Sequence, residues 1–149
     1  GDYHLGQVLY TGKDFIIIDF EGEPVKHPSE RRLRYSAFRD IAGMIRSFEY
    51  AAYSRFFRQL EVVPEEEEFL YSRAGEWART VSGIFLTNYL ETMGESPILP
   101  LTREHREILL YVFLLDKAFY ELNYELNNRP EWVVIPLQGI AEILRDTAQ

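Results

Sequence analysis

From residue 36 onward, apolar residues recur at intervals of three and four, which is the spacing of amphipathic helices. The pattern predicts a helix that begins near Ser36 and is broken at Val63-Pro64, and a second that begins at residues 65–68 and ends before a loop at 94–100. A third is predicted over 102–127, with Thr102 as its N-cap, and a fourth over 136–144. Residues 8–18 predict a β-hairpin. We therefore expect a mainly α fold with a small β-hairpin, forming a single domain over residues 1–149.

The apolar positions also predict which face of each helix is buried. In the long third helix they are expected to form a seam, so that this helix is central and largely buried. The stripes are Ile41, Met44, Ile45, Phe48, Ala52 and Phe56; then Leu70, Ala74, Trp77, Val81 and Ile84; then Ile108, Val112, Leu115, Phe119, Leu122 and Leu126.

Composition excludes several classes of function. A formal charge of −8 argues against a surface that binds nucleic acid, and the absence of cysteine excludes disulfides, a thiolate nucleophile and a Cys-ligated zinc site. Apolar runs such as 112–115 are far too short to span a bilayer, and the chain does not start with a signal segment. We therefore expect a cytoplasmic protein.

Three residues near the start carry the most specific chemistry. Phosphoryl transfer needs a carboxylate that receives the acceptor's proton and oxygen ligands that hold a divalent metal on the phosphates. Asp2 and Gln7 share one loop, and the hairpin returns the chain so that Asp19 is expected to lie beside them. The spacing predicts a site for ATP and Mg²⁺.

These loops resemble those of a known enzyme family. Gly1-Asp2-x-His4-x-Gly6-Gln7, followed by Ile18-Asp19-Phe20-Glu21, is similar to the catalytic and metal loops of aminoglycoside-phosphotransferase-like kinases. Gln7, where Asn is more usual, and the run Asp-Phe-Glu-Gly-Glu-Pro resemble the maltokinase branch. Two further segments resemble that branch: the helix start at 39–44 and the sugar-recognition motif Lys117-x-x-Tyr120-Glu121-x-x-Tyr124-Glu125.

The resemblance implies a C-terminal lobe of a protein-kinase-like fold that uses ATP to convert maltose to maltose 1-phosphate. It implies that Asp2 is the catalytic base and that Gln7 and Asp19 hold Mg²⁺. Maltokinases are also found fused to trehalose synthase, which makes that enzyme an expected partner. The residues implied to contact the sugar are Lys117, Tyr120, Glu121 and Tyr124, and those implied to support the site are His4, Glu21 and Asp40.

Other interpretations stay open at this point. The 117–125 face equally fits a solvated helix stripe with a Lys–Glu pair at i, i+4. His4 fits a residue that shapes the loop, Glu21 fits either a second metal site or a bond to a nearby amide, and Asp40 fits a helix start. The family's His would precede Gly1, so we expect a fragment without its N-terminal lobe, inactive alone but part of an active parent. The competing class is a non-catalytic kinase-like module that docks or regulates a fused trehalose synthase.

Overall fold

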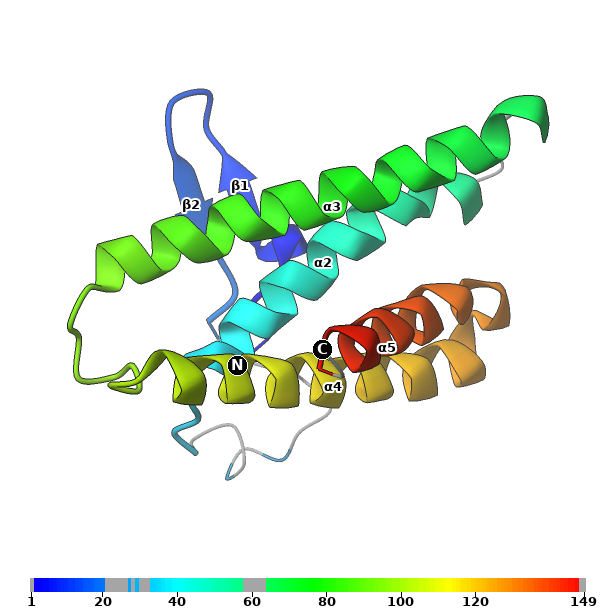
Figure 1. The fold of residues 1–149 in the computed structure, drawn as a ribbon. Coiled ribbons are helices and arrows are strands. Elements are labelled where there is room, and N and C mark those ends of the chain that lie inside the picture. The colour runs from blue at the N-terminus through cyan, green and yellow to red at the C-terminus, as the bar shows by residue number, and fades with distance from the viewer. Residues whose placement is uncertain (1, 21–26, 28, 30–32, 58–63, 148–149) are drawn as a thin grey trace.

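The computed structural model describes residues 2–20, 27, 29, 33–57 and 64–147. Four long helices dominate it, and a two-stranded hairpin stands at one side (Figure 1). The elements in order are η1 (Leu5–Gln7), β1 (Val8–Tyr10), β2 (Phe15–Ile17), α2 (Phe38–Phe57), α3 (Pro64–Met93), α4 (Arg103–Asn128), η2 (Pro130–Trp132) and α5 (Val134–Asp146). The prediction of a mainly α fold with a small hairpin is confirmed. Of the helices described, none is both long and apolar enough to cross a membrane.

The hairpin is antiparallel, with Val8 opposite Ile17 and Tyr10 opposite Phe15. Gly12 makes the reversal with φ +90°, a backbone angle that glycine adopts without strain. Both strands are exposed on their two faces, apart from partly buried Val8. The hairpin therefore contributes little to the core and serves mainly to return the chain toward Gln7.

Helix α2 occupies the centre of the molecule and packs on both α3 and α4. It begins after Ser36, whose hydroxyl accepts a hydrogen bond from the amide of Phe38 at 3.3 Å. Its predicted stripe is confirmed, since Ile41, Met44, Ile45 and Phe48 are buried and the remaining two positions are half-buried. The core cluster consists of Phe38, Ile41, Ala42, Ile45, Leu99, Leu114 and Ile143.

The predicted seam of α4 is wrong. Four of its six positions are exposed: Ile108 by 51%, Val112 by 53%, Phe119 by 56% and Leu126 by 58%. The buried face instead carries Leu114, Ala118, Glu121 and Glu125. It lies roughly a third of a turn away because the two carboxylates, which a sequence pattern assigns to solvent, each have an arginine partner: buried Arg46 for Glu121 and partly exposed Arg129 for Glu125.

The predicted stripe of α3 is shifted in a similar way. Trp77 and Ile84 are 47% and 59% exposed, whereas Gly75 and Ala78 are buried. Small residues face α2 here because the two helices run closely side by side (Figure 1).

The boundaries of the last two helices follow the sequence closely. Thr102 caps α4, because its hydroxyl accepts a hydrogen bond from the amide of His105 at 3.2 Å. Helix α5 begins two residues before the prediction, at Val134, and ends two residues after it. Pro136 falls in its first turn, where the missing N–H would have no intrahelical acceptor, so the helix starts ahead of the proline.

Candidate active site

The loop of residues 2–7 is held against α2. Nδ1 of His4 accepts a hydrogen bond from the amide of Gly6 at 3.1 Å, and the carbonyl of His4 accepts one from Gln7 at 2.9 Å. The amide of Leu5 donates to Oγ of Ser47 on α2 at 3.1 Å. His4 therefore shapes the loop by a backbone hydrogen bond, which was one of its two expected roles.

The hairpin brings Asp19 to Gln7. The amide of Ile18 donates to the carbonyl of Gln7 at 2.9 Å, which extends the pairing one step beyond the two strands. Asp19 follows with φ +60°, a left-handed conformation that few residues other than glycine adopt and that often occurs at functional sites. Gln7 is buried, with 7% of its surface exposed, so its side chain is confined to this corner.

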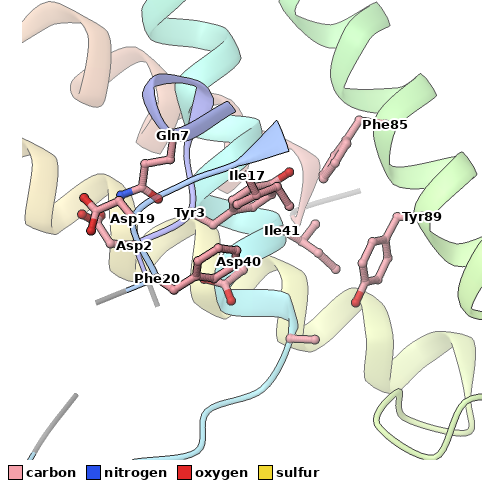
Figure 2. Close-up of a pocket in the computed structure, with 11 residues that line it drawn as sticks. Asp2, Tyr3, Gln7, Ile17, Asp19, Phe20, Asp40, Ile41, Phe85 and Tyr89 are labelled. Carbon is pink, nitrogen blue, oxygen red and sulfur yellow. The ribbon is translucent and has the colours of Figure 1, made fainter. Parts of the chain in front are cut away.

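Asp2, Gln7 and Asp19 line one cavity of about 450 Å³ between the hairpin, α2 and α3. Figure 2 shows their side chains gathered at one end, with Phe85 and Tyr89 of α3 at the other. Asp40, in the first turn of α2, lines the same cavity beside Tyr3. Burial, and secondarily the charge of Asp40, raise the pKa of the Tyr3 phenol. The structure thus brings the three predicted residues together and places Asp40 near them.

The donor set suits Mg²⁺ bound together with a nucleotide. Among the described residues, no group of three His, Cys, Asp or Glu side chains could hold a metal. One carboxylate and one amide oxygen still fit Mg²⁺, which keeps several waters and takes the rest of its ligands from phosphate oxygens. Glu21, which was predicted to support the site either at a second metal or by a bond to a nearby amide, lies outside the described residues.

A second cavity, of about 430 Å³, lies on the other side of Asp2. It is lined by all four residues that were predicted to contact the sugar, Lys117, Tyr120, Glu121 and Tyr124. Nζ of Lys117 lies 3.8 Å from Oδ1 of Asp2, and Nε2 of His4 lies 4.0 Å from its Oδ2. The 117–125 face is therefore the wall of a pocket, and the burial of Glu121 and Glu125 does not fit a fully solvated stripe.

The aromatic rings of this second cavity remain accessible. Tyr120 and Tyr124 are 40% and 46% exposed, and each has a cation over its face. Nζ of Lys117 lies 5.0 Å from the Tyr120 ring centre, and Cζ of Arg129 lies 5.6 Å from that of Tyr124. Exposed rings beside charged hydrogen-bonding groups suit a sugar, which presents C–H faces as well as hydroxyls.

Sequence reasoning predicted no individual role for several polar residues of this region, although Glu125 belongs to the motif. Glu125 is only 1% exposed and accepts from Nη2 and Nε of Arg129, at 2.6 and 2.8 Å, and from the Tyr50 hydroxyl at 3.1 Å. Burial raises the pKa of the Tyr50 phenol, so it remains a hydrogen-bond donor. The i, i+4 spacing of Glu125 and Arg129 in the sequence could have predicted their ion pair.

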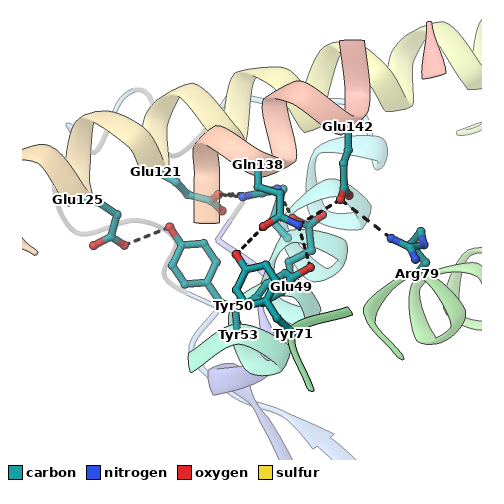
Figure 3. A network of polar contacts seen from close by, with 10 residues as sticks. Glu49, Tyr50, Tyr53, Tyr71, Arg79, Glu121, Glu125, Gln138 and Glu142 are labelled. Carbon is teal, nitrogen blue, oxygen red and sulfur yellow. Dashed lines mark hydrogen bonds and ion pairs between the residues drawn. The ribbon is translucent and has the colours of Figure 1, made fainter. Parts of the chain in front are cut away.

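The polar groups continue behind this cavity as a network between α2, α3, α4 and α5 (Figure 3). Gln138 of α5 donates to the Tyr53 hydroxyl at 3.0 Å and accepts from that of Tyr71 at 2.6 Å. Glu142 lies 4.0 Å from Arg79. Arg46, the fully buried arginine of α2, contacts both Glu49 and Glu121. These partners lie up to 85 residues apart in the sequence, so no local sequence pattern predicts these contacts.

Comparisons with known proteins point to sugar kinases. No family profile matches the chain. The chain is 26% identical over 144 residues to a glucosamine kinase of Streptacidiphilus jiangxiensis, and 29% identical over 149 residues to one of Mycolicibacterium smegmatis (strain ATCC 700084 / mc(2)155). Each match covers 97% of this chain but only 31% and 33% of the relatives, so the chain spans about a third of their length.

Solved structures agree with these relatives. A glucosamine kinase in complex with glucosamine, ADP and inorganic phosphate superposes with a TM-score of 0.80 at 25% identity, over 99% of this chain and 35% of that one. Crystal form A of glucosamine kinase gives 0.78 at 24% identity, over 97% and 31%. The fold matches the C-terminal lobe of a kinase-like protein, and the chain is similar to sugar kinases over nearly all of its length.

Proposed function

We propose that this chain is the C-terminal catalytic lobe of an ATP-dependent sugar kinase. The observation that carries the proposal is the position of Asp2, which lines both cavities and so lies between a nucleotide–metal corner and a pocket suited to a sugar. The natural polypeptide that carries the chain would supply the remaining nucleotide contacts.

The proposed reaction transfers the γ-phosphoryl group of ATP to a sugar hydroxyl. The carboxylate of Asp2 accepts the hydroxyl proton while the sugar oxygen forms its bond to phosphorus and the bond to ADP breaks. Gln7 and Asp19 would hold Mg²⁺, which neutralises phosphate charge when bound. His4 and Lys117 flank Asp2, with nitrogen atoms 4.0 and 3.8 Å from its carboxylate oxygens.

Glucosamine is the acceptor that we propose first. The similarity to glucosamine kinases over 97% of the chain supports it, as does the solved complex that contains glucosamine and ADP. The pocket wall also carries the carboxylates of Asp2, Glu121 and Glu125 as hydrogen-bond acceptors for a protonated amine, beside the cations of Lys117 and Arg129. Maltose is the second candidate, because the complete motif of residues 117, 120, 121 and 124 lines the pocket. A fused trehalose synthase remains a prediction of the maltokinase resemblance alone.

The test is a coupled assay of ADP release by the natural polypeptide with glucosamine, with maltose and without acceptor, followed by mass spectrometry of the product. We expect acceptor-dependent ADP release and a sugar phosphate. Asp2→Asn should lower kcat by about 10²–10⁴-fold without loss of thermal stability. Asp116→Asn, an exposed carboxylate of α4 that lines neither cavity, is the matched control. ATP turnover with no phosphorylated sugar, or full activity of Asp2→Asn, would contradict the proposal.

A further inference from the structure

Arg46 of α2 is a charged residue whose side chain has 0% exposure. It lies on the buried face of α2, against the carboxylates of Glu49 and Glu121. A buried guanidinium is costly unless carboxylates compensate it, and the cost is large when one of a pair is removed. Such a residue needs a reason beyond packing, because an apolar side chain of similar volume would serve the core as well.

One of the two partners of Arg46, Glu121, lines the second cavity, which is the candidate acceptor pocket. Nε and Nη2 of Arg46 both approach Oε2 of Glu121, at 2.8 Å each. Glu121 comes from α4, 75 residues further along, and is 8% exposed. Both nitrogens contact the same oxygen, which leaves Oε1 outside this contact. Glu121 lines the acceptor pocket and Arg46 does not, so any influence of Arg46 on a ligand passes through Glu121.

The neighbouring carboxylate is held by a comparable arrangement. Arg129 holds Glu125 with two hydrogen bonds, but Arg129 lines the pocket itself. Two buried carboxylates one helical turn apart are thus each fixed by a guanidinium, one from within the pocket and one from behind it. Ion pairs and hydrogen bonds therefore hold both Glu121 and Glu125 in the pocket wall, which favours selection among acceptors by the position of their hydrogen-bonding groups.

We infer that Arg46 is a positioning residue for the acceptor: it fixes the orientation of the Glu121 carboxylate, which in turn contacts the sugar. This rests on the proposed function and adds to it a determinant of acceptor affinity that lies outside the pocket. The ion pair of Arg46 with Glu49, on its own helix, holds the guanidinium in register for that contact.

The test is a double-mutant cycle in the natural polypeptide, with Arg46→Met, Glu121→Gln and the pair together, measuring kcat and KM for the acceptor and for ATP. We expect Arg46→Met to lower kcat/KM for the acceptor at least tenfold and to change KM for ATP less than twofold. In the Glu121→Gln background the same change should cost less than threefold, because its route to the acceptor is already impaired. Arg46→Lys should recover part of the loss.

Tyr71→Phe is the matched control, since it removes a partly buried hydrogen bond between α3 and α5 away from the acceptor pocket. It should lower thermal stability without changing either KM. If Arg46→Met does not fold, Arg46→Lys carries the test, with an expected three- to tenfold rise in acceptor KM at constant KM for ATP. Full additivity in the cycle, or equal losses toward ATP and acceptor, would overturn the inference while leaving the kinase proposal standing. A wild-type protein that phosphorylates no sugar would overturn both.

Discussion

A β-carbon on residue 139 would lie 1.8 Å from Nη1 of Arg46 and 2.7 Å from its Cζ. Helix α5 therefore passes directly over the buried guanidinium, and glycine makes this approach possible. The guanidinium has no room to withdraw, because Glu49 and Glu121 hold it on two sides. The close approach of Gly139 to Arg46 thus links α5 to α2, and the ion pair of Arg46 with Glu121 extends the link to α4.

Gly139→Ala should therefore destabilise the protein. The added methyl group must displace either α5 or a charged, ion-paired side chain, and overpacking of this kind costs about 1–3 kcal/mol. The free energy of unfolding in urea measures the effect. Gly83→Ala is the control, because Gly83 is exposed within α3 and a β-carbon there meets nothing within 4 Å. That variant should be unchanged or up to about 1 kcal/mol more stable. Equal behaviour of the two would show that the space at Gly139 is not required.

Gly43→Ala should impair catalysis more than stability. A β-carbon there would lie 2.6 Å from the carbonyl oxygen of Tyr3, a backbone atom that cannot rotate away. The loop that carries Asp2 must then move off α2, against its bond to Ser47. Because small displacements of a catalytic group are costly, we expect kcat to fall at least tenfold. The measurement is kcat beside the thermal midpoint. An unchanged kcat with a lowered midpoint would mean that the loop position is not critical.

The sequence was informative where structure is local. Turn residues such as Gly12 and the cap Thr102 act on their immediate neighbours, so the hairpin and the ends of α4 could be placed from sequence. The association of Gln7 with Asp19 was also predictable, since a short hairpin must return the chain to its starting point. The roles assigned to these residues remain proposals.

The buried face of α4 could not be predicted for a physical reason. Apolar side chains at Val112 and Phe119 suggested the core, and Glu121 and Glu125 suggested solvent. The order is reversed because Arg46, on another helix, stabilises one of these carboxylates inside the protein. A sequence pattern assigns a carboxylate to the surface because burying it without a partner is unfavourable. The pattern contains no information about a partner 75 residues away.

The stability of the protein should decrease between about pH 4.5 and pH 7 through Glu49. Burial raises the pKa of this carboxyl from 4.5 to about 7, the charge of Arg46 opposes the rise, and Glu121 and Glu142 add to it. The folded state then binds a proton more tightly than the unfolded state, so this contribution to stability is complete below pH 4.5 and lost as pH rises through 7.

Glu49→Gln removes the titrating group and reports this effect. The variant's free energy of unfolding, relative to that of the parent, should rise by about 1–3 kcal/mol from pH 5 to pH 8. The change in the difference is the informative quantity, because the loss of the ion pair with Arg46 adds an offset at each pH. Urea unfolding at four pH values suffices. A difference that stays flat, or that falls with pH, would assign the proton to another member of the network.

Lys117→Met should lower kcat/KM for the acceptor and leave ATP binding intact. Nζ of Lys117 lies between the carboxylate of Asp2 and the ring of Tyr120, on the side of Asp2 that faces the second cavity. It does not line the cavity that contains Gln7 and Asp19. A hydrogen bond to a charged group is worth about 1.5–3 kcal/mol, so kcat/KM for the acceptor should fall roughly tenfold or more.

The matched control is Arg103→Met on the same helix, where the side chain is 91% exposed and pairs with Glu107 at 2.6 Å. That change removes a cation and an ion pair without touching either cavity, so it should leave both KM values unchanged.

Glucosamine and maltose assayed in parallel add a second comparison. Loss of the Lys117 cation should lower kcat/KM more for maltose, a neutral sugar that accepts a hydrogen bond from Lys117, than for glucosamine with a protonated amine. For the amine, the change also removes charge repulsion. Equal damage toward ATP and acceptor by Lys117→Met would assign this residue to the support of Asp2 and not to the sugar.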